Sequence, residues 1–234
     1  MRVEIWSDVV CPWCYVGKRN FEAALSRFEH RDDVEVIWRA FELDPSAPAE
    51  REGDYVAHLA RKYGMSVEQA RKMIETMSAT GAKAGVALDF DRARPGNSFD
   101  AHRLIHLAGQ QGVQDAVKER FLRATFTDGE PIGDRDALLR LAVEAGLPQA
   151  DAASVLANDV FAAEVRAEES LALELGISAV PFFVIDRTFG IPGAQPPDVI
   201  LGALERAWQK TAHPLESADT AAAAPGCDGD ACAI

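Results

Sequence analysis

The chain has 234 residues, of which 48% are hydrophobic and 26% charged, and its formal net charge is −13. This length corresponds to one large domain or two small ones, and it allows a hydrophobic core without disulfide cross-links. The negative charge disfavours nucleic-acid binding, because an acidic surface repels the phosphate backbone. No apolar run approaches the roughly 18 residues of a membrane-spanning helix.

The N-terminus lacks the features of a secretory signal. Met1–Asp8 contains no apolar signal segment and instead has the composition of a strand. We therefore expect a cytoplasmic protein without a membrane partner. In that compartment structural disulfides are rare, and closely spaced cysteines are usually redox-active or bind metal. The sequence gives no indication of the oligomeric state.

The first part of the chain predicts a β-α-β unit. Val3–Ser7 and Val34–Phe41 have the composition of strands, and the apolar positions between Pro12 and Phe28 fit one face of a helix. Because a helix connects the two strands, we expect them to be parallel, with a right-handed crossover.

The middle of the chain predicts a long run of helices, separated mainly at glycines. The expected segments are 54–63, 66–81, 98–111, 114–127, 134–145, 149–157 and 160–175. Between them, Gly85–Pro95 has the least regular pattern, and we expect an extended loop there.

The last part of the chain returns to a strand pattern. Val180–Asp186 is expected to pair with Phe189–Ile191, and a final helix is expected over about 197–210. The remaining residues lack periodicity and have the composition of a tail. The two β-containing ends are best placed in one sheet. The predicted organisation is an α/β domain of residues 1–45 and 177–210, an all-helical insertion over 46–176, and a tail over 211–234.

Four cysteines form two close pairs at opposite ends of the chain, Cys11/Cys14 and Cys227/Cys232. In the first pair, Pro12 favours the first position of a helix, which places Cys11 at the N-cap and Cys14 about one turn inside. The N–H groups and dipole at a helix N-terminus are expected to lower the pKa of Cys11. Cys14 is then placed to attack a mixed disulfide formed at Cys11. This pattern favours a redox-active pair over half of a zinc site or two unrelated core cysteines.

Pro181 lies where a strand is expected to begin. Proline has no N–H to donate to a sheet, and a cis bond between Val180 and Pro181 would resolve this conflict. It would also leave the backbone of Val180 available to an extended substrate. The alternative is an ordinary trans proline at the first position of the strand.

Together these features resemble the DsbA-like branch of the thioredoxin superfamily, and more narrowly the FrnE-like cytoplasmic oxidoreductases. The resemblance covers about residues 1 to 210 and rests on Cys11-Pro12-Trp13-Cys14 behind Ser7-Asp8, on Asn97–Leu104, and on Ala179–Phe182. It implies a thioredoxin-like fold interrupted by a large helical domain. It also implies that Cys11 is the nucleophile, Cys14 the resolving thiol and Pro181 a cis residue.

The second cysteine pair has three interpretations. Cys227 and Cys232 are separated by four residues that include Gly229, and such a loop can close into a reducible disulfide. The pair would then exchange electrons with Cys11 and Cys14. This arrangement resembles that of some FrnE-like proteins. Two exposed thiols without a role, or metal ligands, are the alternatives.

Other polar and aromatic side chains are weaker candidates. Asp8 either has a role at the site, where it tunes the thiol pKa or receives a proton, or it only ends the strand. His102 and His106 lie on one helix face without an obvious third metal ligand, so we expect partly buried polar side chains facing the cleft between the domains, with no metal. His102 is the better candidate by resemblance. Trp13 is expected at a substrate-facing rim, whereas Trp6, Trp38 and Trp208 are expected in the core or an interface.

The favoured function is a thiol–disulfide oxidoreductase or isomerase that acts on protein thiols and disulfides. It needs no cofactor, although glutathione stays open as a redox partner. The alternative is a glutathione-dependent isomerase or transferase of the kappa type, which shares this interrupted fold but typically has serine at the position of Cys11. A binding or accessory protein with a vestigial pair is the third class; it predicts that Cys11→Ser leaves the biological role intact.

Overall fold

The computed structural model describes residues 1–51 and 53–212, so Cys227 and Cys232 lie outside the described residues. No helix in the described ranges is both long and apolar enough to cross a membrane. The elements in chain order are β1 (Arg2–Ser7), α1 (Pro12–Arg27), η1 (Arg31–Asp33), β2 (Glu35–Ala40), α2 (Tyr55–Tyr63), α3 (Val67–Lys83), α4 (Phe99–Gln110), α5 (Gln114–Arg123), η2 (Ala124–Asp128), α6 (Arg135–Glu144), α7 (Gln149–Ala157), α8 (Ala162–Glu174), β3 (Phe182–Ile185), β4 (Phe189–Pro192) and α9 (Pro197–Ala212).

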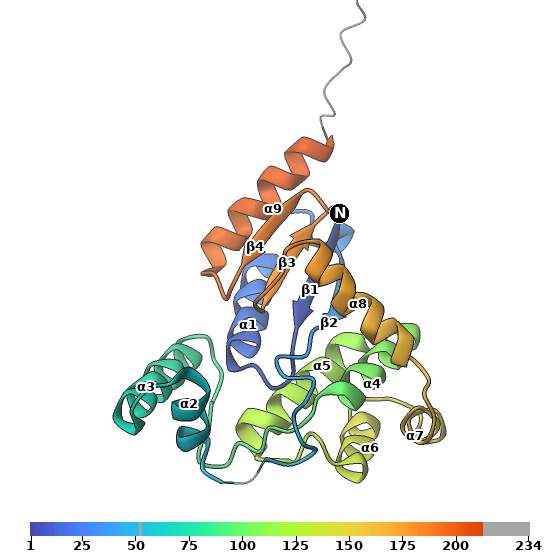
Figure 1. Cartoon of the computed structure of the whole chain (residues 1–234). Coiled ribbons are helices and arrows are strands. Elements are labelled where there is room, and N and C mark those ends of the chain that lie inside the picture. Colours follow the sequence, from blue (N-terminus) through green and yellow to red (C-terminus); the bar gives the residue numbers. More distant parts are fainter. Residues whose placement is uncertain (52, 213–234) are drawn as a thin grey trace, which may run out of the picture.

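The four strands form one mixed sheet with the order β2-β1-β3-β4. β1 runs parallel to β2, and Ile5 lies opposite Trp38. On its other side β1 pairs antiparallel with β3, where Ile5 lies opposite Phe183, and β3 and β4 form an antiparallel hairpin. The pairing of the two distant ends of the chain, the parallel crossover and the hairpin are as the sequence predicts (Figure 1).

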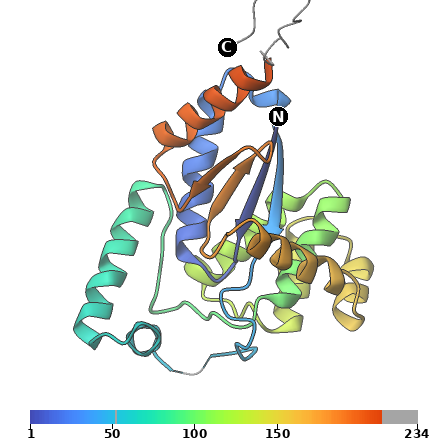
Figure 2. The ribbon, with the colours of Figure 1, turned by 45° about the horizontal axis from the view of Figure 1, so that its top comes forward.

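Both faces of the central strand are covered, because alternate side chains of a strand point in opposite directions. Val3 and Ile5 belong to the core that α1 and α9 complete, and these two helices lie side by side (Figure 2). Trp6 points to the other face, where its indole N–H donates to the backbone oxygen of Glu168 in α8 at 3.1 Å. The sheet is therefore a buried central layer.

The buried apolar side chains form two groups. The larger group joins the sheet, α1 and α9 to α4, α5, α6 and α7 without a break. The smaller group surrounds Cys11 and Cys14 and includes Trp6, Leu59 of α2 and Met77 of α3. The predicted domain boundaries stay a prediction.

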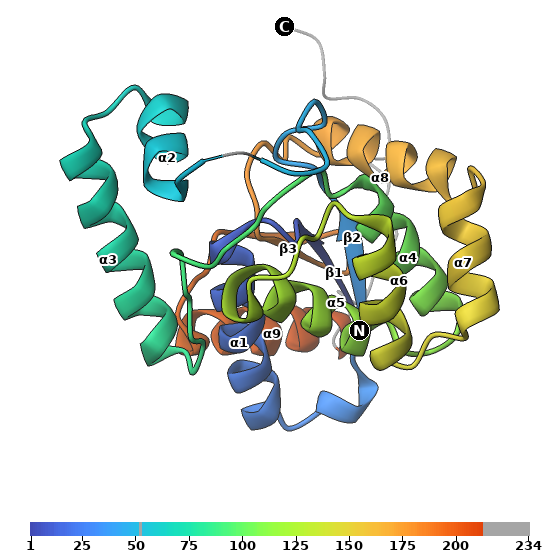
Figure 3. The same ribbon diagram turned by 90° about the horizontal axis from the view of Figure 1, so that it is seen from below.

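Helices α2 and α3 form a hairpin that stands apart from the other helices (Figure 3). Asp54 caps α2 by accepting from the N–H of Val56. Gly64 then ends α2 in the left-handed conformation, with φ of 62°, which glycine adopts without steric cost. Ser66 and Gln69 form a reciprocal capping box that begins α3. The predicted loop over 85–95 is confirmed, and it leads the chain back to α4.

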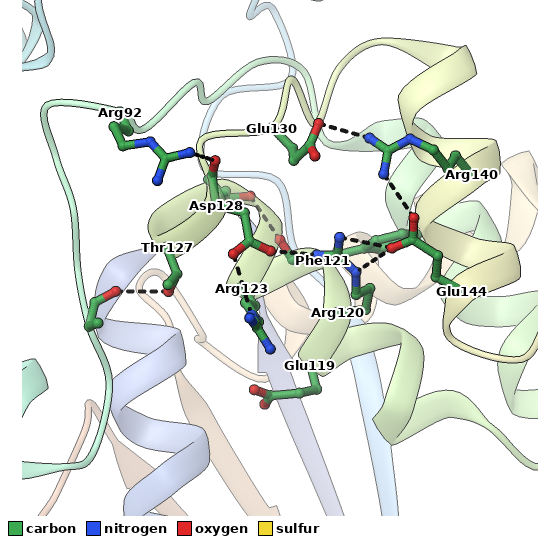
Figure 4. A network of polar contacts seen from close by, with 12 residues as sticks. Arg92, Glu119, Arg120, Phe121, Arg123, Thr127, Asp128, Glu130, Arg140 and Glu144 are labelled. Carbon is green, nitrogen blue, oxygen red and sulfur yellow. Dashed lines mark hydrogen bonds and ion pairs between the residues drawn. The ribbon is translucent and has the colours of Figure 1, made fainter.

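Where the sequence predicts one helix over 114–127, the structure has two elements. α5 ends at Arg123, and a short π-helix, η2, follows and ends at Gly129, whose φ is 73°. Arginine and acidic side chains surround η2 in a network of ion pairs (Figure 4). Arg120 contacts Asp128 at 3.0 Å and Glu144 at 2.9 Å, and Arg140 also contacts Glu144 at 2.9 Å. We call these residues the η2 network.

Candidate active site

The cysteine pair lies where the central strand passes into the first helix. Cys11 is the N-cap of α1 in an extended conformation, and Pro12 occupies the first position of the helix. The N–H of Cys14 donates to the backbone oxygen of Cys11 at 3.0 Å. The helix start expected from the sequence is thus confirmed.

Both cysteines are free thiols and both are buried, with 4% of Cys11 and 0% of Cys14 exposed. Cys14 lies about one helical turn after Cys11, inside α1. The Cys11 thiol also lies 3.6 Å from the backbone oxygen of Val180, to which it donates. Cys11 lines a cleft, whereas Cys14 does not.

The lowered pKa that the sequence predicts for Cys11 is wrong. The hydrogen bond with Cys14, burial and the nearby negative charges of Cys14 and Asp8 raise the pKa of Cys11 well above its usual value. Burial also acts to raise the pKa of Cys14, but the hydrogen bond from Cys11 and the ammonium group of Lys118 outweigh it and lower that pKa. The helix N-terminus is only one of the influences on the pKa values of two buried thiols. The opposite shifts describe two thiols that titrate as one coupled pair, in which the first proton lost leaves the second one shared between the two sulfurs.

The bond between Val180 and Pro181 is cis, as the sequence predicts. β3 begins only at Phe182, so these two residues precede the strand. Gly17 of α1 packs against the proline ring, because a Cβ atom there would lie 2.7 Å from Cγ of Pro181. The absence of a side chain at Gly17 thus lets α1 bring Cys11 beside Val180.

Asp8 and His102 form a buried pair, 0% and 1% exposed respectively. Oδ1 of Asp8 lies 3.3 Å from Nε2 of His102, and Oδ2 accepts from the N–H of Leu43 at 2.7 Å. Burial acts to raise the pKa of Asp8, but the hydrogen bond and charge of His102 outweigh it and lower that pKa. The partly buried, cleft-facing position predicted for His102 is wrong, because α4 packs on the core and this side chain does not line the cleft.

His106 does not join the pair. Its Nε2 lies 3.1 Å from Oε2 of Glu168, and its ring stacks on Phe161. Among the described residues, no group of three or more histidine, cysteine or acidic side chains is placed to hold a metal ion.

A fully buried lysine, which the sequence analysis missed, lies at the site. Nζ of Lys118 in α5 donates to the backbone oxygen of Ser7 at 3.1 Å. The signal was present in the sequence, since Lys118 shares the buried helix face with Val117, Phe121 and Leu122. A lysine at an apolar position of an amphipathic helix is unusual and therefore marks a candidate functional residue.

The cleft at Cys11 has a volume of about 240 Å³ and lies between the cysteine loop, Val180 and the α2–α3 hairpin. Leu59, Met73 and Met77 supply an apolar wall. At the rim, Trp13 and Tyr63 are 38% and 56% exposed, as the sequence predicts for Trp13. Arg51, Asp44 and Lys62 line the cleft as well; Arg51 pairs with Asp44 at 2.6 Å, and Lys62 adds a positive charge. His58 also lines it, and burial and the nearby Arg51 lower its pKa, so its ring is uncharged at pH 7.

The other tryptophans lie away from the cleft. Trp6 and Trp38 are buried at 0% and 3% exposure. Trp208 of α9 stacks on His30 with ring centroids 4.2 Å apart and meets Phe28 edge-on. All three pack in or against the core, as expected.

Comparisons with known proteins agree with this geometry. Residues 2–205 match the family described as DSBA-like thioredoxin domain. A protein of Bacillus subtilis (strain 168), described as the uncharacterized protein YwbO, is 33% identical over 212 residues, which are 90% of this chain and 98% of that protein.

Two solved structures are also similar. A probable DsbA oxidoreductase from Streptomyces coelicolor has 44% identity and a TM-score of 0.87, with 100% of this chain and 99% of that chain covered. The cytosolic disulfide reductase DsbM from Pseudomonas aeruginosa, solved with GSH, has 18% identity and a TM-score of 0.62, with 89% and 100% covered. The second likeness is one of fold.

Proposed function

Since the chain belongs to the DSBA-like thioredoxin domain family, we propose that it is a thiol–disulfide oxidoreductase that acts on protein thiols and disulfides through Cys11 and Cys14. One observation carries the proposal. Cys11 is a free thiol at the start of α1 that lines a cleft, with the second free thiol, Cys14, fully buried one helical turn behind it. A nucleophile in front and a resolving thiol behind it are the two groups that disulfide exchange requires.

The reaction proceeds in two exchanges. The proton shared by the two sulfurs moves to Cys14, and the Cys11 thiolate attacks a substrate disulfide, which releases one substrate thiolate and leaves a mixed disulfide. Cys14 then gives its proton to the released substrate thiolate, attacks Sγ of Cys11 and releases the second substrate sulfur as a thiolate, which takes up a proton from water to become the second thiol. The enzyme pair is oxidised to a disulfide, and the substrate disulfide is reduced to two thiols. Run in reverse, the same steps oxidise a substrate dithiol.

The surroundings of Cys11 fit a protein substrate. The backbone of Val180 lies beside the sulfur, where an extended segment can pair with it. The apolar wall and the exposed rings of Trp13 and Tyr63 offer contacts to apolar side chains next to a cysteine. In this proposal Pro12 sets the helix start, Pro181 shapes the wall opposite, and Asp8 and His102 position the cysteine loop from below.

The finer assignments belong to the same proposal. We place the protein among FrnE-like oxidoreductases of the cytoplasm, with glutathione as a redox partner and no bound cofactor. Cys227 and Cys232 are proposed to pass electrons to or from Cys11 and Cys14. The kappa-type glutathione enzyme is the weaker alternative, because serine is typical where this chain has Cys11.

The test is a redox titration of the full-length protein in glutathione buffers, with free thiols alkylated and counted for each cysteine peptide by mass spectrometry. We expect Cys11 and Cys14 to titrate together as a two-electron couple. If both thiols stay reduced, or carry only glutathione, across the whole range, the oxidoreductase proposal is wrong.

Matched variants separate the two cysteine pairs. In a Cys227→Ser/Cys232→Ser variant the first pair should still titrate, and its rate of exchange with a protein disulfide reports on the second pair. An unchanged rate would remove the second pair from the proposal and leave the first pair in place.

A further inference from the structure

Among the residues that the structure describes, Lys118 is a buried cation with no carboxylate in direct contact with its ammonium group. Its side chain is 0% exposed; Nζ donates to the backbone oxygen of Ser7 at 3.1 Å and lies 5.6 Å from the centre of the Trp38 ring. Across residues 1–51 and 53–212, no carboxylate lies within 4.0 Å of Nζ. Burying an ammonium group is costly unless an anion lies close by.

A second buried lysine shows the usual solution. Lys18 of α1 is 1% exposed and also faces the ring of Trp38, at 5.9 Å. Its ammonium group, however, contacts the carboxylates of Glu22, Asp115 and Glu119. The two lysines share the same aromatic ring but differ in their counter-ions. Lys118 needs an anion of another kind.

The cysteine pair supplies that anion. Lys118 is bonded to Ser7, the last residue of β1, from which the chain reaches the cysteine pair through one short loop. The ammonium group of Lys118 is among the causes that lower the pKa of Cys14. Cys14 is the largest of the charges that raise the pKa of Lys118, ahead of Asp8 and Cys11, and the positive charge of Lys18 opposes them. Burial acts in the opposite direction and brings the pKa of Lys118 to about 8.

We propose that Lys118 is a positioning residue whose ammonium group is the counter-ion of the Cys14 thiolate and thereby favours the reduced form of the Cys11/Cys14 pair. The inference rests on the proposed function and adds to it a group from the helical segment that controls the redox pair. Opposite charges that approach closely in a site without water stabilise each other far more than they do at the surface.

Oxidation removes one partner of this ion pair. The reduced protein holds one thiol at Cys11, one thiolate at Cys14 and the ammonium group of Lys118. Reaction with a substrate disulfide forms the Cys11–Cys14 disulfide and yields one substrate thiol and one substrate thiolate. Lys118 then remains buried beside an uncharged disulfide. It therefore gives up its proton at lower pH in the oxidised protein than in the reduced protein.

The first test measures this proton in the wild-type lysine. A Cys227→Ser/Cys232→Ser protein with carbon-13-labelled lysine side chains is titrated by NMR in its reduced and oxidised forms, and the Lys118 signal is assigned by its loss in Lys118→Met. We expect the pKa of Lys118 to be lower in the oxidised form by about 1 to 3 pH units. Lys18, held by three carboxylates, is the internal control and should not change. Equal pKa values for Lys118 in both forms would overturn the proposal.

The second test removes or keeps the charge. In the reduced protein, Lys118→Met should raise the pH at which the first thiolate appears by about 1 to 3 units, read from ultraviolet thiolate absorbance. It should also shift the equilibrium with glutathione about tenfold or more toward the disulfide. Lys118→Arg keeps the charge and should restore most of both properties. A folded Lys118→Met variant with an unchanged thiolate titration would contradict the inference.

The two tests separate this inference from the proposed function. If no Cys11–Cys14 disulfide forms under oxidising buffers, the proposed function fails, while the thiolate titration of the reduced protein still decides whether Lys118 stabilises Cys14. If the disulfide forms and Lys118 titrates identically in both forms, only the inference fails.

Discussion

Charged side chains gather in two regions of this molecule, and burial gives them different effects. Beneath the cysteine pair, Asp8, His102 and Lys118 are at most 1% exposed. In the η2 network, the side chains of Arg120 and Arg140 are 20% and 48% exposed (Figure 4). Water screens the second group, so each of its pairs contributes little to folding. In the buried group the charges are unscreened, and the pKa values of both thiols respond to them.

The largest effect we expect is at the cysteine pair itself. Cys11→Ser should abolish disulfide exchange with a protein substrate, because serine does not form the mixed disulfide. Cys14→Ser should instead accumulate the mixed disulfide, since the resolving thiol is gone, and mass spectrometry detects this product. Residual exchange by Cys11→Ser in the Cys227→Ser/Cys232→Ser background would show that the reaction does not begin at Cys11.

The buried pair of Asp8 and His102 should dominate stability. Asp8→Asn removes a buried carboxylate that holds His102 and the N–H of Leu43, so we expect a loss of about 3–5 kcal/mol in the free energy of unfolding. Chemical denaturation measures this loss. Because the pKa of Asp8 is lowered in the folded protein, its stabilisation is present above the ordinary value of 3.8 and is lost as the pH falls through the lowered pKa. The free energy of unfolding of Asp8→Asn, measured by denaturation at several pH values, should therefore lack this loss at acid pH.

A packing change beside Pro181 tests whether the cleft depends on shape as well as charge. Gly17→Ala places a methyl group 2.7 Å from Cγ of Pro181, and this overpacking should cost about 1–3 kcal/mol in the free energy of unfolding. It should also weaken substrate binding, seen as a raised KM, because Pro181 is displaced toward the cleft. Gly202→Ala in α9 is the control, since the nearest atom to its added Cβ is 3.9 Å away, at the end of the flexible side chain of Arg206. Equal behaviour of the two variants would contradict the close fit.

Glu42 combines features of both regions, because its carboxylate is buried but forms an ion pair with the half-exposed Arg166. Burial raises its pKa to about 7, with Arg166 opposing and Glu169 adding to the rise. Because the pKa of Glu42 is raised in the folded protein, its protonated form contributes its full stabilisation below pH 4.5. This contribution is lost as the pH rises through 7. Glu42→Gln should therefore gain roughly 1–2 kcal/mol relative to the wild type at pH 8 but not at pH 5. Thermal or urea unfolding at the two pH values measures it, and an equal effect at both would refute the prediction.

The smallest effect belongs to the η2 network. Arg140→Ala should change the free energy of unfolding by less than about 1 kcal/mol, and less still in high salt, because its pairs with Glu130 and Glu144 are exposed. Disulfide exchange should not change. A loss of exchange in this variant would show that the network reaches the cysteine pair and would remove the contrast between the two regions.

Much of the fold was open to prediction because its signals are local. The change from a strand pattern to a helix pattern at Pro12, and back near Val180, locates the elements that carry the site. Hydrophobic periodicity also separates the helices of the middle segment. The π-helix at the end of α5 had no such signal, because the side chains of 124–128 continue the helical pattern and only the ending at Gly129 distinguishes it.

The site was less predictable because its electrostatics depend on residues that are distant in the sequence. Cys11, Cys14 and Pro181 are recognisable from motif and context. The pKa of Cys11, however, depends on how deeply the pair is buried and on the charges that fold beside it. Lys118 reaches the backbone of Ser7 because α5 packs against β2 and α1. A helix pattern predicts which face of α5 is buried but not what that face contacts.

The edge of the sheet at β2 has a consequence for solubility at high concentration. Gln114 imitates a neighbouring strand there, since its amide accepts from the N–H of Trp38 at 2.9 Å and donates to the oxygen of Trp38 at 3.2 Å. The N–H of Ala40 is taken by Glu168 at 2.7 Å. An exposed edge with free backbone groups is a template for aggregation through added strands. Side chains from α5 and α8 close this edge at Trp38 and Ala40, so a second molecule cannot extend the sheet there.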